Sequence, residues 1–284
     1  WQAELGVMSL DPVMPGEPGF LSAPAMGSYI SSVLNNTLNL LIVGVPIDPF
    51  VAPGVKLQAY SESLGSLEYA YFYLNPQTSI AASFGVDPGI PDVQGGVQAL
   101  QWTTNPLRSR ADLSEDITIP GTDENVIRQL PLPEIQLGGY FSSTRLLIDN
   151  ASELGEGINR GLYGSMTWPV DVPIGLDNRI WAGGTVSLDP ANNPYPTFIA
   201  GGWLSQGILP GRPLDVLALG LGRTSFSPTI NPGLNYEGTI ELNYSLYLSE
   251  IFQIQPVVQW IVNPGGAGKV PGIWAGGVQI NLSL

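Results

Sequence analysis

The chain has 284 residues, and its 24 acidic and 10 basic side chains give it a net charge of −14. This balance argues against binding to nucleic acids, which depends on clustered lysine and arginine. The absence of cysteine and histidine excludes disulfides and thiol chemistry, and it removes the commonest metal ligand and general base. Only 12% of the residues are charged, yet no run approaches the roughly 18 to 20 apolar residues that a membrane-spanning helix needs.

About thirteen segments alternate apolar with polar or small residues, and this pattern predicts β-strands, since successive side chains of a strand point to opposite faces. Segments of about ten residues separated by turn residues are typical of a transmembrane β-barrel. No amphipathic helix pattern competes with this, and no change in composition marks a domain boundary. The predicted strands are 3–9, a weaker one within 29–43, 55–62, 67–74, 96–104, 134–144, 161–168, 178–188, 195–205, 215–225, 236–248, 253–262 and 273–284.

The last strands separate the two faces most clearly, although Pro256 interrupts one of them and Arg223 falls on the apolar face of another. The aromatic residues Tyr236, Trp260 and Trp274 lie on the apolar face beside loops, as in the girdles of membrane interfaces. The same alternation also fits a soluble β-sandwich, in which these aromatics would belong to the core. The apolar faces of 236–248 and 273–284 comprise Tyr236, Ile240, Leu242, Tyr244, Leu246, Leu248, Trp274, Val278, Ile280, Leu282 and Leu284.

Two stretches near the C-terminal end carry a family resemblance. "GILPGRPLDVLALGLGRTSF" (207–226) and "YEGTIELNYSLYLSEIFQIQPVVQWIVNPGG" (236–266) resemble the end of the carbohydrate-selective, OprB-like porins. "APGVKLQAY" (52–60) and "LPEIQLGGYFSST" (132–144) look like earlier strands of that family. The resemblance covers most of residues 50–284 and is specific in the last eighty or so.

The resemblance implies an all-β fold, a transmembrane antiparallel up-and-down β-barrel, of about sixteen strands in the family. It also implies an outer-membrane porin that passes small hydrophilic solutes, among them carbohydrates, passively and with weak selectivity. No cofactor or metal is expected. Two departures stand out: basic residues are few along the predicted pore, and the last residue is Leu284, where such barrels usually end in an aromatic.

If the apolar face meets lipid, the opposite face lines a lumen. Amide side chains both donate and accept hydrogen bonds, and Trp181 can pack on a sugar ring, so this wall suits neutral hydroxylated solutes that bind weakly and leave. Each residue could equally do no more than solvate the wall. The predicted pore-lining residues are Lys56, Gln58, Arg179, Trp181, Glu237, Glu241, Gln253, Gln255, Gln259, Gln279 and Asn281.

The alternative functions are a soluble acidic carbohydrate-binding β-sandwich and a glycoside hydrolase. A hydrolase needs two carboxyl groups about 5 to 9.5 Å apart. Glu237 and Glu241 share a face but lie four residues apart, roughly 13 Å along a strand. We therefore expect no enzyme. The turn 188–194, "LDPANNP", offers calcium-type oxygens but is interpreted as a plain turn.

The chain is expected to form one outer-membrane domain over residues 1–284. With 273–284 as the closing strand, the links 75–95, 145–160, 189–194, 226–235 and 263–272 are predicted to be extracellular, and 61–66, 169–177, 206–214 and 249–252 periplasmic. The segment 105–133 then becomes an unusually long periplasmic insertion.

An odd number of strands cannot return the chain to its starting side, and an open edge cannot face lipid. We therefore expect about three further strands before Trp1, and a signal peptide already removed. The expected partners are outer-membrane lipid, small hydrophilic solutes such as sugars, and a homotrimer or other chains of an outer-membrane assembly, with no nucleic acid.

Overall fold

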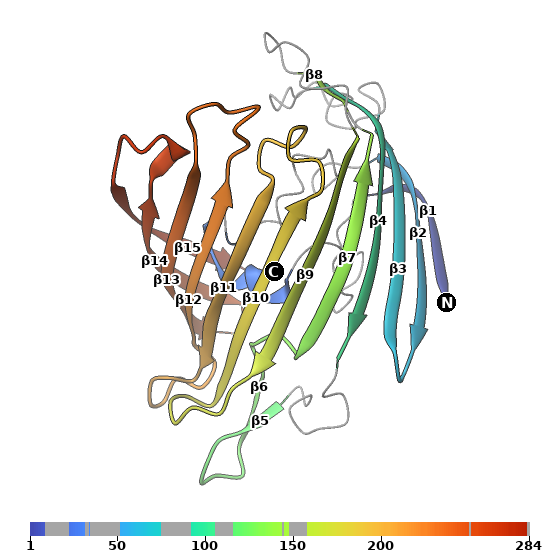
Figure 1. The fold of residues 1–284 in the computed structure, drawn as a ribbon. Coiled ribbons are helices and arrows are strands. Elements are labelled where there is room, and N and C mark those ends of the chain that lie inside the picture. Colours follow the sequence, from blue (N-terminus) through green and yellow to red (C-terminus); the bar gives the residue numbers. More distant parts are fainter. Residues whose placement is uncertain are drawn as a thin grey trace.

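A computed structural model describes residues 1–8, 23–31, 34, 52–74, 92–105, 116–143, 145–147, 158–249 and 251–282. Its core is a curved antiparallel sheet in which each strand pairs with the next along a single path (Figure 1). In order along this path the strands are β1 (Gln2–Met8), β2 (Ala52–Ser61), β3 (Gly65–Leu74), β4 (Asp92–Thr104), β7 (Glu134–Ser142), β9 (Asn159–Pro169), β10 (Asp177–Ser187), β11 (Thr197–Gln206), β12 (Val216–Ser225), β13 (Tyr236–Ser249), β14 (Phe252–Val262) and β15 (Gly272–Leu282).

Five short elements accompany this sheet in the described part of the chain. β8 (Arg145–Leu147) pairs with β4, and β5 (Asp116–Thr118) pairs with β6 (Asn125–Ile127) in a separate hairpin. The 3-10 helix η1 (Pro24–Ser28) lies inside the curve of the sheet, and η5 (Pro264–Gly266) belongs to the link between β14 and β15. Within the described residues, no helix has the length and apolar character needed to span a bilayer.

The predicted fold class, an all-β antiparallel up-and-down barrel, is confirmed, and most predicted strands match observed ones within a few residues. The strand predicted within 29–43 is wrong over the part that the structure describes, because Tyr29, Ile30 and Ser31 are not in a strand. β1 instead pairs directly with β2, from Gln2 opposite Gln58 to Met8 opposite Ala52. No place remains in the sheet for a strand between these two. The rest of that predicted strand, apart from Leu34, lies outside the described residues.

The links alternate between the two ends of the sheet. One end, called here the long-loop end, carries 9–51, 75–91, 143–158, 188–196, 226–235 and 263–271. The other, the short-turn end, carries 62–64, 170–176, 207–215 and 250–251, together with the long link 105–133. The path of twelve strands returns the chain to the end at which it starts, whereas the predicted thirteen would not.

The two faces of the sheet differ in the way that the alternation predicts. The outer face is apolar and exposed, with Leu221 58%, Ile240 45% and Ile280 60% accessible. The inner face holds amides, hydroxyls and buried aromatics such as Phe72 and Phe198. A contiguous apolar surface of this kind is not typical of a soluble monomer, so the outer face fits a lipid environment.

Candidate functional site

A row of inward-facing residues crosses five neighbouring strands. Trp181 of β10 lies opposite Gly202 of β11, Gly202 opposite Gly220 of β12, Gly220 opposite Glu241 of β13, and Glu241 opposite Gln259 of β14. The two glycines therefore leave bare backbone between an aromatic ring and a carboxylate. This row is the floor of the candidate site.

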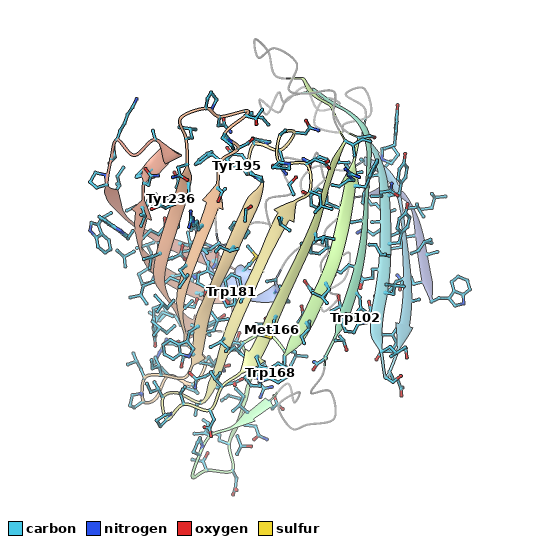
Figure 2. The ribbon with its side chains drawn as sticks, viewed as in Figure 1. Trp102, Met166, Trp168, Trp181, Tyr195 and Tyr236 are labelled. Carbon is cyan, nitrogen blue, oxygen red and sulfur yellow. The ribbon has the colours of Figure 1, made fainter. Side chains whose placement is uncertain are left out.

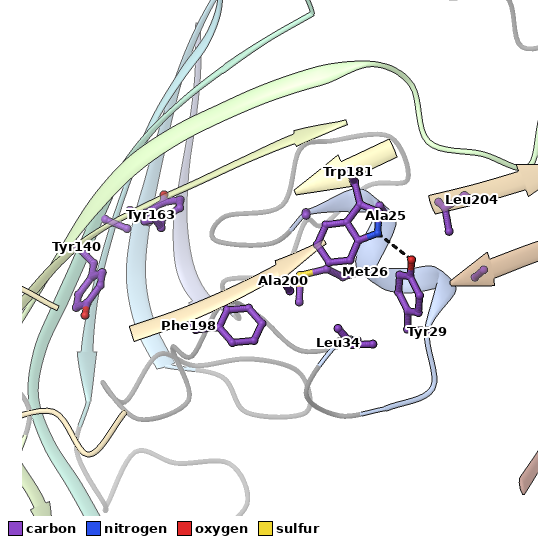
Figure 3. Packing of buried hydrophobic residues seen from close by; sticks show 14 of the residues in the cluster. Ala25, Met26, Tyr29, Leu34, Tyr140, Tyr163, Trp181, Phe198, Ala200 and Leu204 are labelled. Carbon is purple, nitrogen blue, oxygen red and sulfur yellow. Dashed lines mark hydrogen bonds between the residues drawn. The ribbon is translucent and has the colours of Figure 1, made fainter. Parts of the chain in front are cut away.

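Tyr29 fills the bare stretch above the two glycines. Its hydroxyl accepts a hydrogen bond from Trp181 Nε1 at 2.8 Å and donates one to the carbonyl oxygen of Leu219 at 3.0 Å (Figure 3). A Cβ at Gly202 would lie 2.3 Å from the Tyr29 hydroxyl, and one at Gly220 would lie 2.4 Å from the Tyr29 ring. The glycines are therefore what allows the Tyr29 ring to lie against the wall.

Glu241 holds the backbone next to Tyr29. Its Oε1 accepts a hydrogen bond from the N–H of Ile30 at 2.8 Å, and its Oε2 accepts one from the N–H of Ser31 at 2.6 Å. Asn243 Nδ2 and Gln259 Nε2 donate to the same carboxylate at 2.7 and 2.9 Å. The carboxylate is fully buried. Hydrogen bonds to an ionised acceptor are stronger than neutral ones, so these contacts fix the segment firmly.

Two amides of β13 and β14 add contacts to the residue before Tyr29. Asn243 Nδ2 and Gln255 Nε2 both donate to the carbonyl oxygen of Ser28, at 3.0 and 3.1 Å. Before Ser28, Ala25 and Met26 are buried on the inner side of the wall. We call residues 23–31 and Leu34 the inner segment. It lies over β10–β14 inside the sheet and covers part of the predicted pore wall.

A second stretch contacts the inner wall near the short-turn end. Gln206 Nε2 donates to the carbonyl oxygen of Ile127 at 3.0 Å, and Gln206 Oε1 accepts from the N–H of Gln129 at 2.7 Å. Asp177 pairs with Arg128 at 2.9 Å and with Arg179 at 2.5 Å. The end of the long link 105–133 therefore folds back onto β10 and β11.

Every predicted pore-lining residue lies on the inner face of the sheet. Four of them are buried beneath other parts of the chain. Arg179, Trp181, Glu241 and Gln255 are at most 6% exposed. The expectation that these four line open water is corrected, since they hold the inner segment and the returning link 105–133 instead. Glu237 lies at the rim, where it accepts a hydrogen bond from the N–H of Gly265. The predicted residues that remain at least partly accessible are Lys56, Gln58, Glu237, Gln253, Gln259, Gln279 and Asn281.

Several residues of the site are missed by the pattern of alternation. Tyr29 is predicted in a strand, and the role of Gly202 and Gly220 is invisible without their neighbours. The signal available in the sequence is that Gly202 and Gly220 stand at inward positions of their strands, where a side chain would otherwise fill space.

The turn 188–194 is occupied by an ion pair. The Asp189 carboxylate accepts hydrogen bonds from Arg160 Nε at 3.0 Å, Nη2 at 2.9 Å and the backbone N–H at 2.8 Å. The side-chain hydrogen bonds from Arg160 lower the pKa of Asp189. The Asp189 carboxylate is therefore bound by Arg160 and holds the turn at the rim of the sheet.

The predicted interface aromatics lie on the outer face. The rings of Trp260 and Trp274 pack with their centroids 4.8 Å apart. Figure 2 shows Tyr236 towards the long-loop end, and Trp102 and Trp168 towards the short-turn end. Trp102 and Trp168 are not predicted as interface residues. The outer face thus carries aromatic residues near both of its ends, as interface girdles do.

Comparisons with known proteins agree with this arrangement. Residues 167–284 match the sequence profile of the family described as carbohydrate-selective porin, OprB family. The chain is similar to the high-pH structure of OprB from Pseudomonas putida, with a TM-score of 0.72, 15% sequence identity, and coverage of 99% of this chain and 69% of that chain. No curated protein matches the sequence. The family profile covers β10–β15, and the structural match shows that the chain shares a β-barrel fold with that porin.

Proposed function

We propose that the chain is a porin through which small hydrophilic solutes, among them carbohydrates, diffuse passively and with weak selectivity. The observation that carries the proposal is the contrast between the faces: a lipid-type outer surface encloses an inner face rich in amides and hydroxyls. Such groups exchange hydrogen bonds with water and sugars alike, and transport needs contacts weak enough to release the solute. A channel rather than an enzyme accounts for this contrast.

The inner segment narrows the path in this proposal. It occupies the inner side of β10–β14, so solutes would pass between it and the side of the wall formed by β1–β4. That side offers Lys56 and Gln58, and the Gln58 amide donates to Glu68 Oε1 at 3.3 Å. We infer that this polar strip, more than Trp181, meets the solute.

Liposome swelling tests the proposal. Liposomes with the purified protein should swell in pentose and hexose solutions faster than protein-free liposomes, and the rate should fall steadily as the sugar becomes larger without saturating. Single-channel steps in a planar bilayer should accompany the swelling. If protein that is folded in detergent gives neither swelling nor channel steps, the proposed porin function is wrong.

We further propose that additional strands close the wall between β15 and β1. Among the described residues the pairing path has β1 at one edge and β15 at the other. Unpaired N–H and C=O groups cost several kcal/mol each in lipid, so both edges need partners. The strands would come from residues outside 1–284 or from another chain.

Introduced cysteines test this closure, because the chain has none of its own. Leu5→Cys can be combined in turn with Val278→Cys, Ile280→Cys or Leu282→Cys on β15. A disulfide needs Cα atoms about 4.4 to 6.8 Å apart, so no intramolecular disulfide is expected. A disulfide within one chain would show that β1 and β15 pair directly, and the additional strands would then be wrong.

A further inference from the structure

Arg223 interrupts the apolar stripe on the outer face of β12. The preceding outward positions are Leu217, Leu219 and Leu221, and Arg223 continues the same face and is exposed. Among the strand residues whose side chains the structure describes, one other arginine, Arg160, lies on the outer face. That side chain is already bound to Asp189 at 2.9 Å.

An aromatic ring orients the Arg223 guanidinium. Its central carbon lies 4.2 Å from the centroid of the Tyr236 ring on β13. Arg223 is directly opposite Gly238, which has no side chain, while Tyr236 is opposite Ser225. The arginine can therefore lie diagonally across the glycine onto the ring, in a cation–π contact.

No described carboxylate forms an ion pair with Arg223. The nearest acid along β13, Glu237, belongs to the inner face and accepts a hydrogen bond from the N–H of Gly265 at 2.6 Å. The ring contact occupies a face of the guanidinium, and its N–H groups lie in the plane of the group. These donors remain available to an acceptor on the lipid side of the wall.

The position of Arg223 matches the level of lipid headgroups. It lies two residues before the end of β12 at the long-loop end, beside Tyr236 and near the Trp260–Trp274 pair. The cost of an arginine on a lipid-facing surface falls steeply from the midplane to the interface. Hydroxyl groups lie next to it, since Ser225 follows on the same face and pairs with Thr197 of β11.

We propose that Arg223, Tyr236, Ser225 and Thr197 form a surface site for the phosphate of a membrane lipid. A guanidinium binds a phosphate through two parallel N–H···O bonds, and hydroxyls can donate to the remaining oxygen. The sequence predicts that the links of the long-loop end are extracellular, so the ligand we propose is a phosphorylated glycolipid of the outer leaflet. The site rests on the membrane location of the barrel and does not depend on solute transport.

Native mass spectrometry in a neutral detergent tests this proposal. The probes are bisphosphorylated lipid A, the same glycolipid without phosphates, and inorganic phosphate. The protein should retain lipid A and not its phosphate-free form, and Arg223→Gln should lower the retained fraction about tenfold, equivalent to about 1.4 kcal/mol. Arg223→Lys should give an intermediate value, because lysine keeps the charge but not the fork of donors.

Arg160→Gln is the matched control, because it removes an outer-face arginine that is already paired, and it should retain lipid A as the unmodified protein does. Circular dichroism should show the same β content for each variant. Equal retention by Arg223→Gln, or equal retention of the phosphate-free glycolipid, would overturn the site. If Arg223 binds inorganic phosphate but the protein does not retain lipid A, the ligand of the site is a free anion and the lipid proposal is wrong.

Discussion

The carboxylate of Glu241 accepts a hydrogen bond from the backbone N–H of Ser31, 210 residues earlier in the chain, at 2.6 Å. This contact joins the first link of the sheet to β13. Together with the hydrogen bond from Ile30, it makes Glu241 the main anchor of the inner segment. Predictions about the pore therefore begin with this carboxylate.

Glu241→Ala should release the inner segment and raise the single-channel conductance. Hydrogen bonds to a charged group contribute about 1.5 to 3 kcal/mol each, and the substitution removes the acceptor of several. Glu237→Ala is the control, since Glu237 accepts from Gly265 at the rim. If the two variants conduct alike, the inner segment does not narrow the path.

Gly220→Ala should displace Tyr29 by steric overlap, because the added Cβ would lie 2.4 Å from its ring. Trp181 would lose its contact with the Tyr29 hydroxyl and become accessible to iodide, so fluorescence quenching should increase. Gly238→Ala places its Cβ no closer than 3.5 Å to its nearest neighbours and should leave quenching unchanged. Unchanged quenching in Gly220→Ala would contradict the position of Tyr29.

Ile280→Arg should impair folding, whereas Gln279→Arg should fold and alter the conductance. Ile280 is 60% exposed on the outer face, two residues before the end of β15, so an arginine there should cost less than the about 2 to 4 kcal/mol of the bilayer midplane and lower the folded fraction in part. Heat-dependent mobility on electrophoresis reports the folded fraction of each variant. Similar folding of both variants would mean that the faces of β15 are assigned wrongly.

The pore should prefer cations weakly. The chain carries 24 acidic against 10 basic residues, and Asp177 binds both Arg128 and Arg179 on the inner wall. Reversal potentials across a salt gradient measure the preference. A clear anion preference would show that Lys56 dominates the narrow part of the path.

The rim ion pair should lose its contribution to stability in acid. Arg160 lowers the pKa of Asp189, so the contribution is complete above the ordinary aspartate pKa of about 3.9. It disappears as the pH falls through the lowered folded-state value. Thermal unfolding of Arg160→Gln should therefore match that of the unmodified protein more closely at pH 2 than at pH 7. A constant difference between these pH values would contradict the pairing.

The strands could be predicted because their signal is local. In β13 or β15, each residue's face follows from its position in an alternating run, whatever the rest of the chain does. The inner segment could not be predicted in this way. Tyr29 and Ile30 are apolar because a wall covers them, and an apolar stretch of that length also fits a strand.

The sequence also could not predict which residues of the pore wall are buried. Glu241 and Gln259 occupy the same inward row, but only Glu241 is fully buried, because Ile30 and Ser31 of the inner segment lie over its carboxylate. Which polar residues meet water depends on where a distant link lies. That position is fixed by contacts such as the one between Tyr29 and Gly220, which no local pattern contains.

Two tyrosines on β7 and β9 each lie over a glycine of the other strand. A Cβ at Gly138 would lie 2.2 Å from the Tyr163 ring, and a Cβ at Gly161 would lie 2.3 Å from the Tyr140 ring. These pairs sit two steps apart in the register, Gly138 opposite Tyr163 and Tyr140 opposite Gly161. Sliding one strand along the other by two residues, which keeps the inner and outer faces, would set each ring against a residue with a side chain, so these pairs favour the observed alignment. The alignment of β7 and β9 is therefore fixed by residues of the strands themselves and does not depend on the length of the chain that joins them.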